Sequence, residues 1–568
     1  MLTFTKHQPT ITKLAYTTEG NPLITRYLMP RRIVAEQGAE DASLLLQEFA
    51  RQAAVGFVRK RCVLHSGGYV LLDFGAEFQG GIMITVAGNA SGAALRVVFG
   101  ESVSEALSDI DGDQGATNDH AIRDGVHPLP NTGLTHFRVG MTGFRFVRIE
   151  AVGGDVALEG IQGAFDYREI PYVGWFECSD ERLNEIWNVA AYTVHLNMQE
   201  YLWDGIKRDR LVWIGDSNPE INTICAVFGS NDVVPRSLNF LRDCTRPTEW
   251  MNTIPSYSMW WIVDHWDWYL QNGDRDYLAS QKSYLMALTE HILSQVNEDG
   301  TNRIGASFVD WSSNNTPYMK AGQGAVFVLC LRAAAKILTV LGEDEMAARC
   351  TDAAERVRKQ VYDYAGNKQV AALVALADIV PAKQIDEQVL SVGGAKGFST
   401  FLGYYGLLAK AKAGNVEGAI DLIRTYWGGM LDLGATTFWE DFDIDWLENA
   451  GRIDEIVPEG KVDVHAAYGK FCYTHLRHSL CHGWASGPAP FMSRYLLGVE
   501  VLEPGCRTVA VQPNLCGMSY LKGCYPTPMG VLEIEARMEK DGMQVKIGAP
   551  EGVRVLTDEA EIQKWKEQ

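Results

Sequence analysis

The chain has 568 residues, of which 46% are apolar and 21% charged, and its formal net charge is −20. This length exceeds what one hydrophobic core can fill, so we expect three or four domains. The acidic balance excludes a protein that binds the phosphate backbone of nucleic acids, which needs a basic stripe. It also favours a neutral substrate over a polyanion.

Residues 1–16 lack the basic and apolar segments of a secretory signal, and no run of about 18 apolar residues predicts a membrane span. The eleven cysteines contain no Cys-x-x-Cys pair, and several lie in apolar helical contexts, as Cys225 and Cys330 do. Such thiols are typically buried and reduced, and their spacing supports no zinc site. We therefore expect a cytoplasmic protein, with a secreted disulfide-bonded protein as the weaker alternative.

From about residue 55 to residue 168 the pattern predicts short β-strands. Apolar and polar residues alternate in several of the segments 69–74, 81–86, 94–99, 144–151 and 156–165. Glycine or asparagine separates these segments from one another. This spacing is typical of an antiparallel sandwich, so we predict a β-sandwich accessory domain over residues 1–170. The stretch from Ser102 to Asn131, with Asp109, Asp111 and Asp113, indicates a long loop.

The periodicity becomes helical at Ser179 and Asp180, either of which can cap a helix. Helical patterns then dominate to residue 499, at 281–297, 321–341, 343–364, 401–413, 416–428 and 491–497. No fixed repeat relates them, which favours helical hairpins closed into a toroid over an open solenoid. Strand patterns at 508–512, 530–537 and 543–547 predict a small β domain over residues 500–568.

The stretch from Trp203 to Asp216 holds three carboxylates, three basic residues and two indoles in fourteen positions. Carboxylates suit acid–base catalysis and the binding of sugar hydroxyls, and indoles pack on the C–H faces of sugars. A surface turn with local ion pairs is the simpler alternative. A glycosidase needs a second carboxylate from a distant element, and the segment Thr436–Asp441 offers one in Glu440.

Asp209 lies between Arg208 and Arg210 in the sequence, and two such neighbours would lower its pKa and make it a poor acid. A general acid at this position would need burial or a nearby carboxylate to raise its pKa again.

Other motifs carry weaker signals. Four tryptophans flank Asp264, His265 and Asp267 and indicate either a buried aromatic helix or a sugar cleft; they are Trp260, Trp261, Trp266 and Trp268. The acidic run that follows Glu440 lacks the glycine and final glutamate of a calcium loop, so we predict no metal site. His482 is either a structural histidine or a hydrogen-bond donor to substrate. The adjacent Cys481 does not make a nucleophilic pair with it, and Ser486 lacks the Gly-x-Ser-x-Gly elbow of hydrolases.

Together these stretches resemble the inverting α-L-rhamnosidases of glycoside hydrolase family 78. The family motif Asp-Cys-Pro-Gln-Arg-Asp-Glu-Arg-Leu-Gly-Trp-Thr-Gly-Asp is similar to residues 204–216, and Ala-Thr-Thr-x-Trp-Glu is similar to residues 435–440. The later family histidine corresponds to His482. Weaker matches at 266–269, 310–311, 72–75, 99–101 and 143–147 extend the resemblance over nearly the whole chain.

The resemblance implies an (α/α)6-barrel catalytic domain over residues 171–499, flanked by the N-terminal and C-terminal β-sandwich domains. It implies hydrolysis of terminal α-L-rhamnosides with inversion, without metal or cofactor. Asp209 would be the general acid and Glu440 the base. The residues that it implies in substrate binding are Asp204, Arg208, Trp213, Asp216, Trp266, Trp311, Trp439 and His482.

The chain departs from the family motif in three ways. It has one residue fewer before Asp209, it has Gly205-Ile206-Lys207 in place of Cys-Pro-Gln, and it has Asp209 where the family has glutamate. Because the Asp209 side chain is one methylene shorter than glutamate, it can protonate the leaving oxygen only if its loop lies closer to the substrate. Alternatively, the aspartate indicates a different sugar or a different glycosidic bond. Three alternatives stay open: an exo-glycosidase for another sugar, a phosphorolytic enzyme (which Glu440 disfavours), and a catalytically silent carbohydrate-binding protein. The expected partner is a small-molecule or oligosaccharide rhamnoside, with no nucleic acid and no membrane, and a homodimer is compatible with the sequence.

Overall fold

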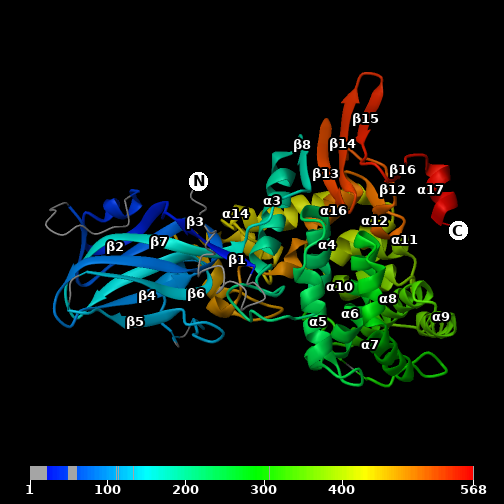
Figure 1. Cartoon of the computed structure of the whole chain (residues 1–568), viewed down its shortest axis with the longest axis horizontal. Helices are drawn as coiled ribbons and strands as arrows, with labels where there is room; N and C mark the ends of the chain where they lie inside the picture. The colour runs from blue at the N-terminus through cyan, green and yellow to red at the C-terminus, as the bar shows by residue number, and fades with distance from the viewer. Residues whose placement is uncertain are drawn as a thin grey trace, which may run out of the picture.

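The computed structural model describes residues 22–48, 60–110, 112, 114–131, 134–305 and 307–566. Figure 1 shows a blue-to-cyan β lobe, a large helical block, and a smaller group of orange-to-red strands near the C-terminal end. This order of β, α and β along the chain agrees with the expected one. The expectations for residues 1–16, and for Asp111 and Asp113, lie outside the described residues.

Among the described residues, the N-terminal lobe contains one seven-stranded antiparallel sheet, in the order β1-β7-β3-β6-β4-β5 with β2 paired to β3. Its strands are β1 (Leu23–Leu28), β2 (Arg32–Glu40), β3 (Cys62–Asn89), β4 (Ala94–Gly100), β5 (Asp124–Pro128), β6 (Thr135–Val152) and β7 (Val156–Arg168). The segments expected at 69–74 and 81–86 are parts of the single strand β3. Its register with β6 shifts between Asp73 and Phe78 and between Gly80 and Ile82. The glycines within these two intervals therefore accompany bulges that bend the strand without ending it.

The loop expected from Ser102 to Asn131 is wrong in part, because it contains the helix α2 (Val103–Leu107) and the strand β5. Ser102 caps α2 by accepting a hydrogen bond from the backbone N–H of Glu105. The connection between α2 and β5 reaches the helical block, where the N–H of Leu476 donates to the carbonyl of Gln114 at 3.0 Å.

The helical block begins with α3, which Asp180 caps by accepting hydrogen bonds from the N–H groups of Arg182 and Leu183. Its helices are α3 (Glu181–Asn197), α4 (Ser217–Val227), α5 (Val233–Cys244), α6 (Pro255–Asn272), α7 (Arg275–Ser294), α8 (Met319–Val340), α9 (Asp344–Arg358), α10 (Lys368–Leu376), α11 (Ala382–Ile385), α12 (Gly403–Lys412), α13 (Val416–Leu422), α14 (Gly428–Asp432), α15 (Val464–Ala467) and α16 (Pro488–Tyr495). The helix expected at 343–364 ends at Arg358. The one expected at 416–428 passes from α13 through a π-helical turn, Ile423–Trp427, into α14.

Helix α8 packs against α6, α9 and α10 in the centre of this block. It is long and apolar enough to span a membrane by length and composition, with a mean hydropathy of 1.6, but 67% of that window is buried inside the protein. Its apolar character is therefore explained by the core that it fills.

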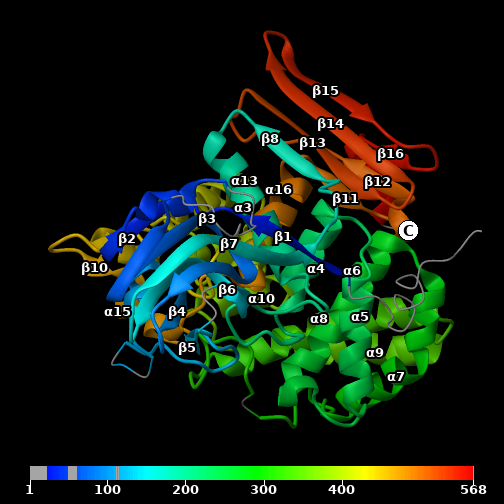
Figure 2. The same cartoon turned by 60° about the vertical axis from the view of Figure 1, so that its left-hand side comes forward.

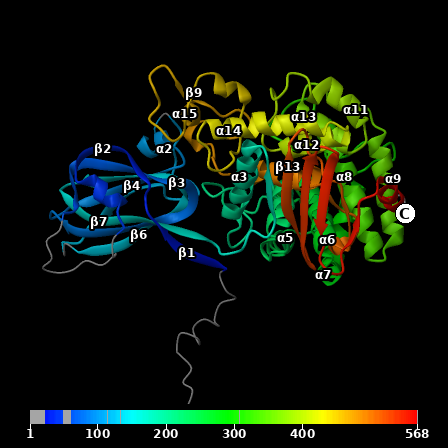
Figure 3. The same cartoon turned by 90° about the horizontal axis from the view of Figure 1, so that it is seen from above.

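Two small sheets follow near the C-terminal end. One has the order β15-β14-β13-β8 and the other β11-β12-β16. The strands are β8 (Trp175–Cys178), β11 (Val499–Val501), β12 (Thr508–Val511), β13 (Tyr520–Thr527), β14 (Gly530–Glu539), β15 (Gly542–Gly548) and β16 (Arg554–Leu556), and α17 (Glu559–Lys566) ends the described chain. Figures 2 and 3 show these strands against the helical block and apart from the N-terminal lobe. Strand β8 precedes α3 in the sequence, so the sheet includes residues from before the helical block.

Two large hydrophobic cores explain how these regions are joined. One core runs through the helical block into the C-terminal sheets. The other fills the N-terminal lobe and also takes in Leu196, Ile206 and Cys481 from the helical block. Ile206 lies inside the charged stretch 203–216, so this stretch is anchored on the N-terminal lobe as well as on the helices.

Candidate active site

A cavity of about 330 Å³ opens where the stretch 203–216 meets the segments around Glu440 and His482. This volume lies near the lower end of the usual range for small-molecule sites, about 300–1,000 Å³. The cavity is lined by Asp204, Asp209, Trp213, Asp216, Ile254, Tyr257, Phe308, Trp311, Asn314, Glu440, Tyr473, His482 and Trp484. Carboxylates and aromatic rings dominate this lining, a composition suited to a sugar.

The loop that carries Asp209 is shaped by a carboxylate of its own. Asp204 Oδ2 accepts a hydrogen bond from the N–H of Asp209, and Asp204 Oδ1 accepts one from the N–H of Leu211, both at 2.9 Å. The carbonyl of Ile206 accepts a hydrogen bond from the N–H of Gly143 on β6 at 2.9 Å. Burial, followed by the nearby charges of Asp216 and Asp209, raises the pKa of Asp204 to about 7.

Asp209 is held between three side chains. The Trp213 indole N–H donates to Asp209 Oδ2 at 3.1 Å, while Oδ1 lies 3.5 Å from a guanidinium nitrogen of Arg208 and 3.3 Å from His120 Nε2. Arg210 does not crowd this carboxylate as the sequence suggests. Its guanidinium donates to the backbone carbonyls of His120 and Met141 and lies over the Trp203 ring, because those acceptors are available on the N-terminal lobe.

Glu440 is buried and lines the same cavity, and hydrogen bonds to its backbone carbonyl and to one carboxylate oxygen hold it in place. Its Oε2 accepts hydrogen bonds from Arg208 at 2.8 Å and from the N–H of Ser479 at 3.1 Å. Its carbonyl accepts the Trp484 indole N–H at 2.9 Å and the Thr400 hydroxyl at 2.5 Å. In the described part of the chain Oε1 has no hydrogen-bond partner, which leaves this oxygen available to a water molecule.

Arg208 links the two carboxylates. One of its terminal nitrogens faces Asp209 and the other donates to Glu440. The Tyr473 ring lies over the guanidinium, 3.4 Å from its carbon to the ring centre, and Nε donates to the carbonyl of Arg477. Arg208 is only 2% exposed and lies behind the cavity wall, so it orients both carboxylates from behind.

Asp216 and His482 form a second polar pair on the cavity. Asp216 Oδ1 accepts the Tyr257 hydroxyl at 3.0 Å, and Oδ2 lies 3.3 Å from His482 Nε2. Burial opposes the protonation of His482, but the hydrogen bond to Asp216 and the charge of Glu440 outweigh it and raise the pKa of His482. Burial likewise raises the pKa of Asp216.

Most of the residues selected from the sequence meet at this cavity; these are Asp204, Asp209, Trp213, Asp216, Trp311, Glu440 and His482. Three of the residues expected to bind substrate, Arg208, Trp266 and Trp439, are corrections, because none of them lines it. Arg208 lies behind the wall and contacts the two carboxylates. Trp266 faces Lys336 beyond the middle of α6, and Trp439 is fully buried against Phe442.

The sequence reasoning missed several cavity residues, namely Ile254, Tyr257, Phe308, Asn314, Tyr473 and Trp484. Trp484 is next but one to His482, and Tyr257 begins the aromatic helix α6, so both had a local signal. Tyr473 had none, since its role depends on the placement of Arg208.

Two clusters have side chains of metal-ligand type. Glu101, Glu105 and His465 lie together, but the ammonium of Lys207 is 3.3 Å from Glu101 and 2.9 Å from Glu105, and Arg123 lies 3.2 Å from Glu105, so two cations face the two carboxylates. Glu440, Cys472 and His478 form the other group, where Arg208 already supplies the positive charge. Each cluster thus contains a cationic side chain in place of a metal ion.

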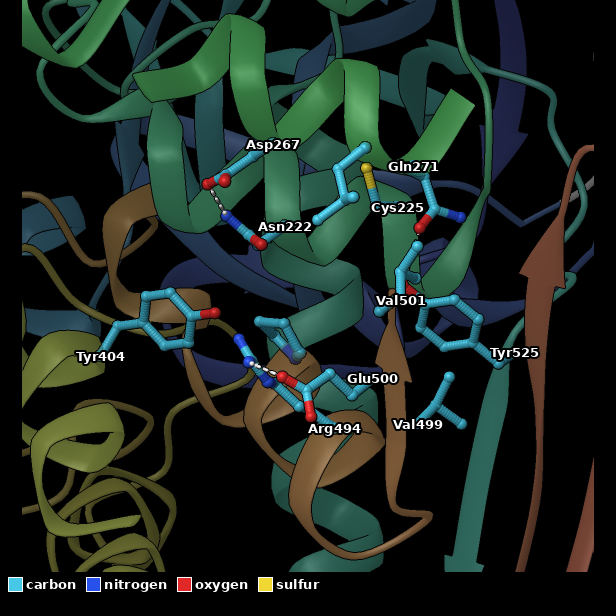
Figure 4. A pocket seen from close by; sticks show the side chains of 13 residues that line it. Asn222, Cys225, Asp267, Gln271, Tyr404, Arg494, Val499, Glu500, Val501 and Tyr525 are labelled. Carbon is cyan, nitrogen blue, oxygen red and sulfur yellow. Dashed lines mark hydrogen bonds and ion pairs between the residues drawn. The ribbon is translucent and has the colours of Figure 1, made fainter. Parts of the chain in front are cut away.

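A separate cavity of about 110 Å³ lies between the helical block and the C-terminal strands (Figure 4). Six of its polar side chains form pairs with one another. Asn222 donates to Asp267, Arg494 to Glu500, and the Tyr525 hydroxyl to Gln271. These pairs connect α4, α6 and α16 to β11 and β13, so the cavity marks a joint between the two regions.

Comparison with known proteins identifies two family matches. Residues 171–496 match the bacterial α-L-rhamnosidase six-hairpin glycosidase domain, and residues 498–562 match the bacterial α-L-rhamnosidase C-terminal domain. A curated α-L-rhamnosidase of Streptomyces avermitilis is 26% identical over 71% of this chain and 41% of its own length. One of Alteromonas sp. (strain LOR) is 23% identical over 75% and 49%. The chain therefore spans about half the length of these relatives.

The fold has a counterpart among solved structures. The crystal structure of a GH78 rhamnosidase of Bacillus sp. GL1 is similar to this chain with a TM-score of 0.72 and 22% identity, over 88% of this chain and 54% of that one. At this identity the likeness concerns the fold, and the chemistry has to be argued from the residues of this chain.

Proposed function

Because the chain belongs to the bacterial α-L-rhamnosidase six-hairpin glycosidase family, we propose that it hydrolyses terminal α-L-rhamnosides with inversion of configuration. The observation that carries this proposal is the pair of Asp209 and Glu440 on one cavity, joined by the guanidinium of Arg208. The relatives that bear the name α-L-rhamnosidase support the choice of sugar.

In the proposed reaction Glu440 is the general base. Its free Oε1 takes a proton from a water molecule, and the water oxygen attacks the anomeric carbon. Asp209 gives its proton to the glycosidic oxygen as the bond breaks. An inverting enzyme needs this division of roles, with room for the water between the carboxyl groups, about 6.5–9.5 Å apart.

The remaining cavity residues bind the sugar. Asp216 and His482 offer an acceptor and a donor for hydroxyl groups, and Trp311, which is 38% exposed, offers a ring to the sugar face. Asp204 acts mainly on the protein, because both of its oxygens hold the loop that carries Asp209.

We also propose the finer architecture and setting. The helices over residues 171–499 would form an (α/α)6 barrel, with β-sandwich domains over residues 1–170 and 500–568, and β8 would complete the second sandwich. The match to the six-hairpin domain supports the barrel. A cytoplasmic setting and a homodimer remain proposals, which fractionation of cells of the source organism and sedimentation would test.

The decisive experiment uses the purified chain and an aryl α-L-rhamnoside, with NMR of the first sugar product. We expect β-L-rhamnose as that product. Asp209→Asn and Glu440→Gln should each lose at least about 100-fold in kcat/KM, as removal of a general acid or base does. The matched control is Asp541→Asn, since Asp541 is an exposed carboxylate on the turn before β15.

Each alternative predicts another result. Retention of the α configuration would contradict inversion. Hydrolysis of a different aryl glycoside in preference to the rhamnoside would assign another sugar. Binding of rhamnose in calorimetry without turnover of any glycoside would indicate a carbohydrate-binding protein.

A further inference from the structure

A segment of the N-terminal lobe reaches the general acid. In the connection between α2 and β5, His120 Nε2 lies 3.3 Å from Asp209 Oδ1, although the two residues are 89 positions apart. His120 does not line the substrate cavity, so its access to the reaction is through Asp209. Its side chain is 26% exposed, which gives the ring contact with solvent.

The segment is fixed to the helical block at His120 and at the preceding residue, Asp119. Arg210 donates to the carbonyl of His120 at 3.2 Å, and Arg477 donates twice to the carboxylate of Asp119, at 2.6 and 3.0 Å. His120 has a left-handed backbone conformation, φ 65°, which is costly for a residue other than glycine. These contacts hold the ring at Asp209 against that cost.

We propose that His120 is a positioning residue that returns a proton to Asp209 in each turnover; this inference rests on the proposed hydrolysis. Asp209 needs such a partner because its other neighbours, the Trp213 indole and Arg208, keep their protons and cannot return one to it. Among the described side chains that contact Asp209, His120 alone has a ring nitrogen that can both accept and give a proton.

The proton path closes within one turnover. As the glycosidic C–O bond breaks, the proton of Asp209 passes to the leaving oxygen, and Asp209 becomes a carboxylate. Imidazolium His120 passes its Nε2 proton to Asp209 Oδ1 and regains one from solvent. Glu440 releases to solvent the proton that it took from the attacking water. One water is consumed, and no net proton is gained or lost.

The charges around His120 favour this role. Asp209 faces Nε2, Asp119 lies 3.6 Å from the same atom, Arg477 pairs with Asp119, and Arg210 binds the carbonyl of His120. Nε2 therefore has a carboxylate oxygen of Asp209 to which it can pass a proton, and the part-exposed ring can regain one from solvent.

The test compares His120→Gln with His127→Gln, a histidine variant on β5 of the same lobe. On a rhamnoside with a poor alkyl leaving group, which depends on protonation by Asp209, His120→Gln should lose about 10- to 100-fold in kcat. On a dinitrophenyl rhamnoside, which needs little protonation, the loss should stay within about threefold. His127→Gln should match the wild type on both.

An equal loss on both substrates, or no loss on either, would overturn the proposal, since a purely structural role does not depend on the leaving group. NMR of ¹³C-labelled histidine provides a readout that does not require turnover. Asp209→Asn should shift the ring resonances of His120 and leave those of His127 unchanged, because Asp209 Oδ1 lies 3.3 Å from His120 Nε2. Unchanged His120 resonances would overturn the contact even if the chain cleaves no rhamnoside, whereas shifted resonances without turnover would refute only the proposed function.

Discussion

Lys207 is the residue whose removal the structure predicts to be most damaging outside the cavity. Its ammonium lies within 3.3 Å of Glu101 and 2.9 Å of Glu105, and it donates to the carbonyls of Leu476 and His478 at 2.6 and 2.8 Å. Lys207→Met would leave two buried carboxylates and two buried carbonyls without this partner. Breaking a buried ion pair from one side costs about 3–5 kcal/mol, so we expect a loss of that size in the free energy of unfolding.

The pH dependence of this loss follows from Glu105. Burial raises its pKa, but Arg123 and Lys207 outweigh burial and bring the pKa from 4.5 to about 2. A carboxylate with a lowered pKa contributes stability above its unfolded value, and this contribution is lost as pH falls towards the folded value. At about 1.4 kcal/mol per unit the whole shift is worth about 3 kcal/mol, of which Lys207 supplies a part. The difference between wild type and Lys207→Met should therefore shrink by about 1–2 kcal/mol between pH 6 and pH 3.5.

Denaturant unfolding followed by tryptophan fluorescence, repeated across that pH range, measures both effects. The control is Lys359→Met, because Lys359 is an exposed lysine at the end of α9. A Lys207→Met protein as stable as Lys359→Met would contradict the role of Lys207 in neutralising buried carboxylates. A difference in the free energy of unfolding between wild type and Lys207→Met that did not change with pH would contradict the contribution of Glu105.

Two further predictions concern buried groups near the cavity. Burial raises the pKa of Asp264 from 3.8 to about 8, against the hydrogen bonds from Ser217 and Asn218. The folded protein thus holds this proton more tightly than the unfolded chain, and stability relative to Asp264→Asn should fall as pH rises from about 4 to 8, measured by calorimetric Tm at several pH values. Trp213→Phe removes the indole N–H that donates to Asp209 Oδ2 at 3.1 Å. Because this bond orients the carboxyl group of the proposed general acid, its loss should lower kcat/KM on an aryl rhamnoside about 10-fold; an unchanged kcat/KM would contradict this assignment.

The elements and the cavity carboxylates could be predicted because their signals are local. Asp180 caps α3 as its position before a helical pattern indicates. For Trp260, Trp261 and Trp268 the buried-helix alternative was correct, since all three are almost fully buried. Trp266 shows the limit of such patterns. The start of α6 lines the cavity through Tyr257, but a periodic pattern does not say how far along a helix the cavity extends.

The surroundings of Asp209 could not be predicted, because they depend on contacts between distant segments. From the sequence two arginines appear to flank it, yet Arg210 turns to carbonyls on the N-terminal lobe. The histidine that contacts Asp209 comes from a stretch whose composition indicates only a loop. Neighbours in the sequence thus gave the wrong electrostatic environment for the acid.

These contacts make the N-terminal lobe part of the framework that holds the two proposed catalytic carboxylates. Ile206 is buried in the core of the lobe, and Lys207 is paired with Glu101 and Glu105, so the loop that carries Asp209 is anchored there by packing and by charge. On the other side of the cavity, the N–H of Glu77 on β3 donates to the Thr436 hydroxyl, and Thr437 donates to the Glu77 carboxylate, four and three residues before Glu440. Both carboxylates are therefore positioned between the helices and the lobe, and the lobe also brings His120 to Asp209.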